Sequence, residues 1–399
     1  TNIEFSNNSE LQYIGIYSFY GSKINKIVIP SKIQQIGNNA FQNTRSLQAF
    51  ELSEDSELRV IESNTFNSST IRSIKIPSNV EIIEHNAFQN CRNLQTIGFY
   101  PNSKLRLIED NAFESCRLEK ITIPSSVQII ANNVFKNCNY LSSLDFQENS
   151  DLNFLGNEVF SSSSITKLMI PPKLTEISER CLLGANKLTH FDISPENNLY
   201  SFNNSLLLYK RHSDNYALLF VCKSVKEIIL PQNVIEIKPF AFQNCNNLSY
   251  FEIEKGSKLS FIHRNNFNGI NLNTIVIPFC LSNIRTYIQN YSKINKIVIT
   301  DDEILIDKLS FSGLPNLESV SFPYAKKITF EKGSQFLSYY RPLSSQLFND
   351  EPVLNEKIRK VYDELLHENM FPSESQELEY LQTKVLRHCL SECPCFYFA

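Results

Sequence analysis

The sequence has 399 residues, of which 42% are hydrophobic and 20% are charged, with a formal net charge of −4. This is the composition of a folded chain, and without long Lys or Arg runs it excludes strong attraction to nucleic acid or to an anionic membrane surface. No stretch approaches 18 consecutive apolar residues and the first ten residues lack a signal-peptide pattern, so no membrane association is visible in the chain.

The sequence repeats itself with a period of 47 residues. An apolar-x-apolar-Pro motif ends at Pro30, Pro77, Pro124, Pro171, Pro231 and Pro278, in steps of 47 residues except for one step of 60. A Pro-free version lies halfway between these motifs, and the anchor residues Phe41, Phe66, Phe88, Phe113, Phe135 and Phe160 alternate in steps of 25 and 22. Each 47-residue unit therefore holds two repeats, whose lengths are typical of leucine-rich repeats.

Residues 118–124 (LEKITIP) show what one repeat builds. Their apolar positions point into the coil while Lys120 and Thr122 point outwards, following the two-residue period of a strand. Pro124 ends the strand because it has no N–H to donate. We expect a short helical turn around residues 134–135 before the chain returns. A single coil cannot bury its own apolar side, so the pattern predicts about 14 stacked repeats over residues 1–330.

Cysteine occupies one repeated position. Cys91, Cys116, Cys138 and Cys245 each follow an anchor Phe by three residues, and Thr44 or Ser69 replaces Cys in sister repeats. Since small polar residues substitute for Cys here, we favour buried free thiols over a disulfide framework.

The 60-residue step contains an insertion. Two strand-prone runs, Leu206–Tyr209 and Tyr216–Val221, flank the polar segment KRHSDN, a pattern typical of a β-hairpin. We predict a hairpin insertion near 195–224, which serves either as a structural addition or as a protrusion that contacts a ligand.

Helical spacing replaces the repeat from residue 331. Apolar residues recur at helical intervals through 351–390, so residues 331–399 are predicted to form a helical region that caps the solenoid. The tail holds His388, Cys389, Cys393 and Cys395, but a closed zinc site normally needs two such clusters, and we predict no metal or cofactor. The chain has no phosphate-binding Gly loop and no hydrolase or metalloprotease motif, so an enzyme is not expected.

The segments Ile83–Phe99 and Ile237–Ile253, with Pro at alternate strands, resemble the BspA-type leucine-rich repeats of surface antigens in bacteria and mucosal protists. The resemblance covers roughly residues 1–330. It implies a curved, non-enzymatic binding solenoid, often exposed at the cell surface and linked to adhesion. The predicted fold is therefore an α/β repeat solenoid, a leucine-rich-repeat horseshoe with a parallel β-ladder and a C-terminal α-helical extension.

Outward strand positions line the concave face in leucine-rich solenoids, and here basic rows tend to alternate with acidic rows. The candidate ligand-binding residues are Lys120, Asp145, Lys167, His190, Asp192, Glu227, Tyr250 and Glu252. A bland alternative is that these charges are solvated and compensate one another across strands.

These patterns predict a cell-surface or secreted interaction or adhesion protein that binds a protein or glycan, such as a host surface or matrix component. The alternative is a cytoplasmic scaffold that organises a complex through the repeats and the helical tail. Because the chain begins with Thr instead of Met, the location stays open between the two.

Overall fold

The structure is a computed structural model, and it describes residues 2–6, 8–259, 261–262, 266–267, 270–278, 293–306, 316–330 and 396–398. The chain divides into two compact units. The first comprises Thr1–Lys210 with Leu219–Lys223, and the second comprises Arg211–Leu218 with Ser224–Ala399.

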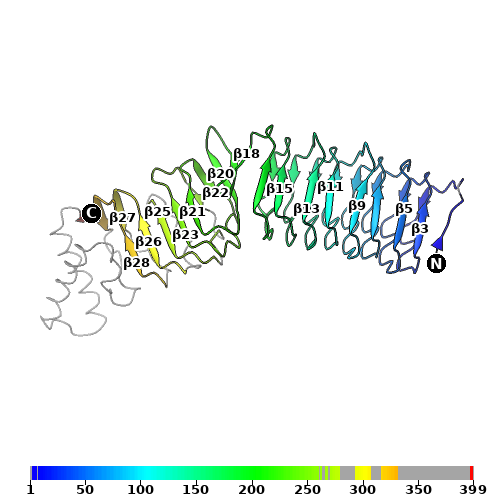
Figure 1. Ribbon diagram of the computed structural model, residues 1–399, viewed down its shortest axis with the longest axis horizontal. Coiled ribbons are helices and arrows are strands. Elements are labelled where there is room, and N and C mark those ends of the chain that lie inside the picture. The colour runs from blue at the N-terminus through cyan, green and yellow to red at the C-terminus, as the bar shows by residue number, and fades with distance from the viewer. Residues whose placement is uncertain are drawn as a thin grey trace, which may run out of the picture. The chain divides into compact units, whose positions relative to one another are not determined.

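The first unit is a stack of coils that share a ladder of main strands, lying side by side in Figure 1. Neighbouring strands pair in parallel, with Lys120 in register with Ser143 and Lys167 in register with His190. The main strands are β1 (Asn2–Ile3), β3 (Lys26–Ile29), β5 (Ala49–Leu52), β7 (Ser73–Ile76), β9 (Thr96–Phe99), β11 (Lys120–Ile123), β13 (Ser143–Phe146), β15 (Lys167–Ile170) and β17 (His190–Ile193). In β11, Ile121 and Ile123 are buried while Lys120 and Thr122 are exposed, as the alternation predicts.

Each coil of the first unit also contributes a two-residue strand to a second ladder. The sequence pattern did not predict this second set of strands. The second ladder comprises β2 (Tyr13–Ile14), β4 (Gln35–Ile36), β6 (Val60–Ile61), β8 (Ile82–Ile83), β10 (Leu107–Ile108), β12 (Ile129–Ile130), β14 (Phe154–Leu155) and β16 (Glu176–Ile177). Strands β6 to β16 form one six-stranded sheet, so two edges of every coil are held by its neighbours.

The second unit repeats this arrangement. Its main ladder comprises β21 (Glu227–Leu230), β23 (Tyr250–Ile253), β25 (Thr274–Ile277), β26 (Lys296–Ile299) and β28 (Ser319–Ser321). Residues Tyr216–Leu218 of β20 (Tyr216–Val221) pair in parallel with β22 (Val234–Ile237), which pairs with β24 (Phe261–Ile262). A further parallel sheet comprises β27 (Glu303–Ile306), β29 (Lys327–Phe330) and β30 (Phe396–Phe398).

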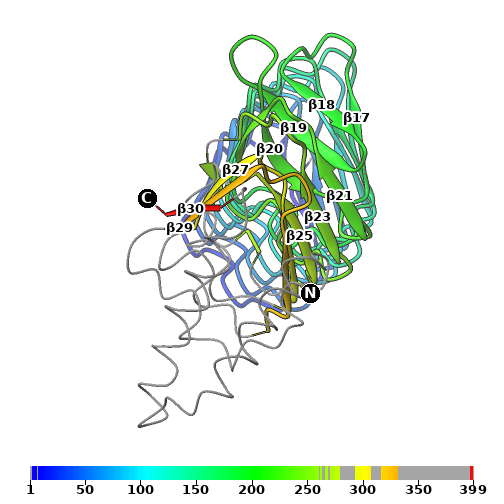
Figure 2. The same ribbon diagram turned by 90° about the vertical axis from the view of Figure 1, so that its left-hand side faces the viewer.

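The predicted insertion near 195–224 contains strands. Both strand-prone runs are extended, as β19 (Leu206–Lys210) and β20, and an additional strand, β18 (Tyr200–Asn203), pairs antiparallel with β19. The two paired strands lie next to each other in Figure 2. The antiparallel pair departs from the parallel pairing of the repeats on either side of it.

The side of the coil opposite the main strands is built from β-turns. In residues 111–116, alternate N–H groups donate to the next coil: Asn111 N to Asn132 O (2.9 Å), Phe113 N to Val134 O (3.1 Å) and Ser115 N to Lys136 O (2.8 Å). The intervening N–H groups donate to carbonyls three residues earlier: Ala112 N to Glu109 O (3.2 Å), Glu114 N to Asn111 O (3.0 Å) and Cys116 N to Phe113 O (3.2 Å). Every donor of the turn is therefore satisfied.

This arrangement corrects the α component of the predicted fold. The described residues contain strands and turns but no helix, and the expected helical turn around residues 134–135 is a pair of β-turns. In an α-helix each N–H donates to the carbonyl four residues earlier, which would leave no donor for the next coil. The parallel ladder is confirmed. The helices predicted for residues 331–399 receive no support. Within this range the structure describes residues 396–398, which form strand β30, and the other residues lie outside the described part of the chain.

Left-handed residues make the turns possible. The first and fifth residues of successive turns have φ near +60°: Asn39 and Asn43, Asn64 and Ser68, Asn86 and Asn90, Asn111 and Ser115, Asn133 and Asn137. Most side chains clash with the following carbonyl in this conformation, but the short polar chain of Asn tolerates it. The abundance of Asn at these positions therefore has a backbone cause.

The anchor phenylalanines form a continuous column through the core of the first unit. Adjacent rings are nearly parallel, and their centroids are separated by 5.0 Å for Phe19–Phe41, 5.7 Å for Phe41–Phe66, 5.1 Å for Phe66–Phe88, 5.2 Å for Phe88–Phe113, 5.8 Å for Phe113–Phe135 and 6.4 Å for Phe135–Phe160. Offset aromatic pairs at such distances contribute beyond the area they bury. The column thus ties each coil to both neighbours.

We expect Phe88→Ala to destabilise the first unit by about 3–5 kcal/mol, because the buried ring loses its contacts with Phe66 and Phe113 and leaves a cavity. Hydrogen exchange should show protection lost first in the adjoining coils, since contacts run between neighbours. Equal loss at distant coils, or no loss, would contradict the stacked arrangement.

A second expectation concerns the left-handed turn position at Asn111, where φ is 58°. Asn111→Ala should cost about 1 kcal/mol, whereas Asn111→Gly should cost much less because glycine enters this region freely. Urea unfolding of the two variants checks this. Equal losses would mean that the Asn side chain, and not the backbone conformation, is what matters.

Candidate binding surface on the strand ladder

The outward side chains of the main strands form a solvent-exposed surface in each unit, which we call the strand face. In the first unit it comprises the outward residues of β3 to β17, such as Lys26 of β3 and Lys120 of β11. It corresponds to the predicted concave face. Lys120 and Thr122 of β11 and Asp145 of β13 are exposed, so these outward side chains are open to a partner.

The middle of this face carries charges with little compensation. Lys120 is exposed, lies in register with Ser143, and has no ion pair among the described residues. Asp145 of β13 accepts a hydrogen bond from Ser143 Oγ at 3.0 Å and is otherwise open to solvent. Two opposite charges therefore stand on adjacent strands without neutralising each other.

The next two strands hold a compact charged group. Lys167 on β15 forms an ion pair with Asp192 on β17, and His190 Nε2 lies 3.2 Å from Asp192 Oδ1. The ammonium of Lys167, and more weakly His190, holds the pKa of Asp192 below its usual range. The imidazole of His190 also packs edge-on against Phe202 of β18, with 5.4 Å between centroids. Asp192 is thus an anion that accepts hydrogen bonds from both neighbours.

The strand face of the second unit holds the remaining candidates. Glu227 lies in register with Tyr250, and Ile229 with Glu252. The hydroxyl of Tyr250 donates to Glu252 Oε2 at 2.6 Å, and burial, aided by this carboxylate, raises the pKa of Tyr250 to about 12. Tyr250 therefore remains a hydrogen-bond donor at neutral pH, beside an Ile229 side chain that is 54% exposed.

The structure thus places five predicted residues on neighbouring strands of the first unit, namely Lys120, Asp145, Lys167, His190 and Asp192. Glu227, Tyr250 and Glu252 lie together in the second unit. That all eight make one ligand-binding surface stays a prediction, because they belong to separate units.

Sequence reasoning missed several contacts of this face. Lys75 of β7 places its ammonium 3.6 Å from the ring centroid of Tyr100, which follows β9, and Lys26 Nζ lies 2.8 Å from Glu51 Oε1. Tyr100 lies beyond the strand's alternating positions, so the alternation alone could not place it on this face. The N-terminal part of the face is therefore more compensated than its middle.

The repeated cysteines are buried free thiols, as predicted for Cys91, Cys116, Cys138 and Cys245. In three consecutive coils the thiol donates to the carbonyl of the anchor Phe one repeat earlier: Cys91 to Phe66 (3.0 Å), Cys116 to Phe88 (3.1 Å) and Cys138 to Phe113 (3.1 Å). Burial raises the pKa of Cys138 to about 12. These thiols hold coils together and are poor nucleophiles.

The described part of the chain shows neither a metal site nor a membrane-spanning helix. It contains no group of three or more His, Cys, Asp or Glu residues suited to a metal ion, and no helix long and apolar enough to cross a bilayer. The tail residues His388, Cys389, Cys393 and Cys395 lie outside it.

The repeats of this chain match a known family of repeat proteins. A family model described as "BspA type Leucine rich repeat region (6 copies)" matches residues 1–106, 106–216 and 214–336. The chain belongs to this family. BspA-type repeat proteins are typically interaction proteins without catalytic activity, and the predicted resemblance is confirmed. Among the curated proteins, none matches the chain.

Solved structures show the same repeat fold as this BspA-type chain. One is the pneumococcal vaccine antigen PcpA, with a TM-score of 0.52 and 19% identity over 87% of this chain and 84% of that one. Another is a leucine-rich cell surface protein of Faecalibacterium prausnitzii A2-165, with a TM-score of 0.52 and 19% identity over 84% of this chain and 87% of that one. At this identity the likeness establishes the fold alone.

The turn side of the BspA-type stack carries compensated charges, in contrast to the middle of the strand face. Glu158 lies 2.8 Å from Lys136 Nζ and 2.6 Å from Arg180 Nη2, so one carboxylate connects three successive coils. The hydrogen bond from Lys136, with further help from Arg180, lowers the pKa of Glu158. A carboxyl group whose pKa falls on folding stabilises the fold above its unfolded pKa, about 4.3 for Glu, and loses that contribution as pH falls through its folded pKa.

We therefore expect Glu158→Gln to lower the free energy of unfolding at pH 7, with the difference from the parent shrinking as the pH is lowered below about 4. Urea unfolding at pH 7, 4 and 3 measures this. Glu148→Gln is the control, because Glu148 is exposed and has no described partner. A difference that persists undiminished at pH 3 would contradict the assigned role.

Proposed function

We propose that this protein is a cell-surface adhesion or antigen-type solenoid that binds a protein or glycan ligand through its strand face. The observation that carries the proposal is the open, two-signed surface around Lys120, Asp145, Lys167, His190 and Asp192 on four neighbouring strands. At about 4.8 Å between strands, four strands span roughly 15 Å. Together with flanking strands, that is enough for an interface of about 800 Å² per partner.

The charge pattern supports orientation of a partner. Lys120 and Asp145 are solvated and available, whereas Asp192 is held by Lys167 and His190. Mixed charges of this kind speed association and set register more than they add affinity. Met169, 39% exposed between these rows, supplies an apolar contact that adapts to a partner's shape.

The contrast with the turn side supports the choice of face. On the turn side Glu158 is paired with Lys136 and Arg180. On the strand face Lys120 and Asp145 have no described ion pair, and solenoids commonly bind partners on such extended surfaces.

Exposure on the cell surface is supported by family membership and by two similar structures, described as a vaccine antigen and as a cell surface protein. These descriptions belong to those proteins. For the present chain they make adhesion to a host surface or matrix the role to test first.

The test is the double charge reversal Asp145→Lys with Asp192→Lys. We expect it to reduce adhesion of beads coated with the full chain to epithelial and matrix-coated surfaces about tenfold or more. The melting temperature should change little, because both carboxylates contact solvent and a surface ion pair contributes under about 1 kcal/mol.

The matched control is Glu54→Lys with Glu148→Lys, two exposed acids at equivalent loop positions after β5 and β13 that have no described partner. It makes the same charge change away from the strand face. If the control abolishes adhesion and the strand-face pair does not, the binding surface lies elsewhere.

A further inference from the structure

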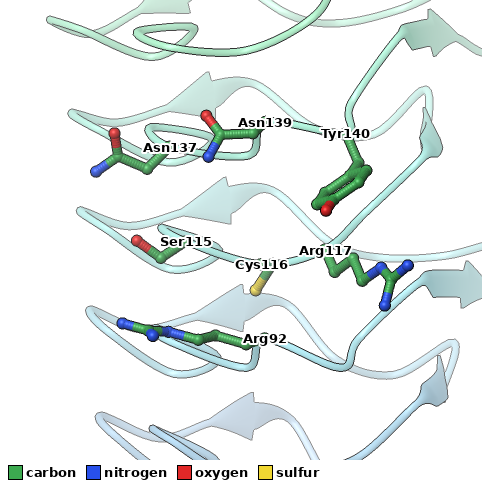
Figure 3. Close-up of a pocket in the computed structure, with 7 residues that line it drawn as sticks. All are labelled: Arg92, Ser115, Cys116, Arg117, Asn137, Asn139 and Tyr140. Atoms are coloured by element: carbon green, nitrogen blue, oxygen red, sulfur yellow. The ribbon is translucent and has the colours of Figure 1, made fainter.

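A hollow lies on the edge of the first unit that connects the turns to the main strands. It has a volume of about 400 Å³ and is lined by Arg92, Ser115, Cys116, Arg117, Asn137, Asn139 and Tyr140 (Figure 3). This size falls in the range of small-molecule sites, roughly 300–1,000 Å³.

The hollow follows from the alternation of repeat lengths. Two residues separate Cys91 from Leu94 and Cys138 from Leu141, but only one, Arg117, separates Cys116 from Leu118 in the coil between them. The middle coil is therefore shorter at this corner, and its neighbours stand above and below the gap. The buried side chain of Cys116 forms the floor.

Short coils elsewhere in the first unit fill this corner differently. Thr70 and Ser164 occupy the position of Arg117, and their hydroxyls donate to backbone carbonyls of the preceding coil, Thr70 Oγ1 to Leu47 O at 3.0 Å and Ser164 Oγ to Asn139 O at 2.5 Å. Arg117 instead reaches outwards, and its guanidinium carbon lies 5.0 Å from the ring centroid of Tyr140. Tyr140 is the aromatic exception at a position held by Ser46, Asn93 and Lys187 in other long coils.

The lining is cationic and uncompensated. It contains two guanidinium groups and no carboxylate, and neither Arg92 nor Arg117 has an ion pair within the residues described. By contrast, Arg106 and Arg180 of the same unit lie 2.6 Å from Glu81 and Glu158. The side chains of Arg92 and Arg117, which both line the hollow, extend in opposite directions in Figure 3. A ligand that spans it therefore meets a positive group at each end.

We propose that this hollow binds an acidic saccharide of about two sugar units, through carboxylate or sulfate groups that pair with Arg92 and Arg117. Guanidinium groups bind such anions in a bidentate manner. The Tyr140 ring, 57% exposed, offers a flat surface to the apolar face of a sugar ring, while Asn137, Asn139 and Ser115 supply hydrogen bonds to hydroxyl groups.

The backbone around the hollow favours a saccharide over an acidic peptide. Extended peptides are commonly bound by main-chain hydrogen bonds to an open strand edge. Here the N–H groups of residues 115, 116, 137 and 138 already donate, Ser115 to Lys136 O, Cys116 to Phe113 O, Asn137 to Ser161 O and Cys138 to Phe135 O. These N–H groups are therefore not available to pair with an extended peptide, which favours a ligand bound mainly through side chains, such as a molecule rich in hydroxyl groups.

Binding of two uronic-acid disaccharides to the full chain, the 6-sulfated and the unsulfated chondroitin disaccharide, each compared with lactose by calorimetry at low salt, tests the proposal. The sulfated disaccharide carries an anion on each sugar and can pair with both arginines, so we expect it to bind most tightly and lactose to bind at least tenfold more weakly than either acidic sugar. Arg92→Gln with Arg117→Gln should lower affinity about tenfold or more, and Tyr140→Ala should lower it for both acidic sugars. The affinity should fall as salt is raised.

The matched control is Arg45→Gln, one 47-residue unit before Arg92, where Thr70 stands in place of Arg117. It should leave affinity unchanged. Equal binding of lactose, an unaffected double variant, or tighter binding of hexaglutamate than of either acidic sugar would overturn the proposal. Because the hollow is separate from the strand face, each of these outcomes leaves the adhesion test on Asp145 and Asp192 independent.

Discussion

The structure depends on hydrogen bonds that leave one coil and end on the next. Both ladders of parallel strands use them, and so does the turn side, where alternate N–H groups of residues 111–116 donate to residues 132–136. A coil that formed its hydrogen bonds internally, as a helix does, could not hold its neighbour at this edge. The phenylalanine column and the buried thiols occupy the space that these bonds define, and each adds contacts between successive coils. The stability of the fold therefore depends on contacts between neighbouring coils, as expected for a solenoid.

This constraint explains which parts of the fold the sequence made predictable. Pro124, Phe113 and the alternation in residues 118–124 report strand ends and core positions directly, because single side chains determine them. The turns were predicted as helical because paired apolar residues such as Val134 and Phe135 fit either conformation. The better signal was Asn at both ends of each turn, as at Asn133 and Asn137, whose φ values of 57° and 60° are incompatible with a helix. The regular spacing of Asn therefore favours turns over a helix, although the spacing of the apolar residues fits both.

The sequence predicted which residues point outwards on the candidate surface, but it did not predict which of their charges are paired. Alternation placed Lys120 and Asp145 correctly, since strand register fixes which way a residue points. It could not show that Lys167 binds Asp192 while Lys120 has no described ion pair, because long side chains choose among rotamers according to neighbours from other coils. The hollow was harder still to foresee. It arises from one missing residue between Cys116 and Leu118, which is only one of the three residues by which the repeat steps of 22 and 25 differ.

In a repetitive scaffold, a binding site can form where a residue departs from the repeat. Where Thr70 or Ser164 satisfies a neighbouring carbonyl, the side chain stabilises the stack and is not free to bind a ligand. Arg117 instead extends into solvent and stacks on Tyr140. The ring holds the guanidinium group in place without neutralising its charge. A rigid stack lowers the entropy lost on binding because backbone and ring are already positioned. We therefore propose that an uncompensated residue at a departure from the repeat, such as Arg117, is one through which the protein recognises another molecule.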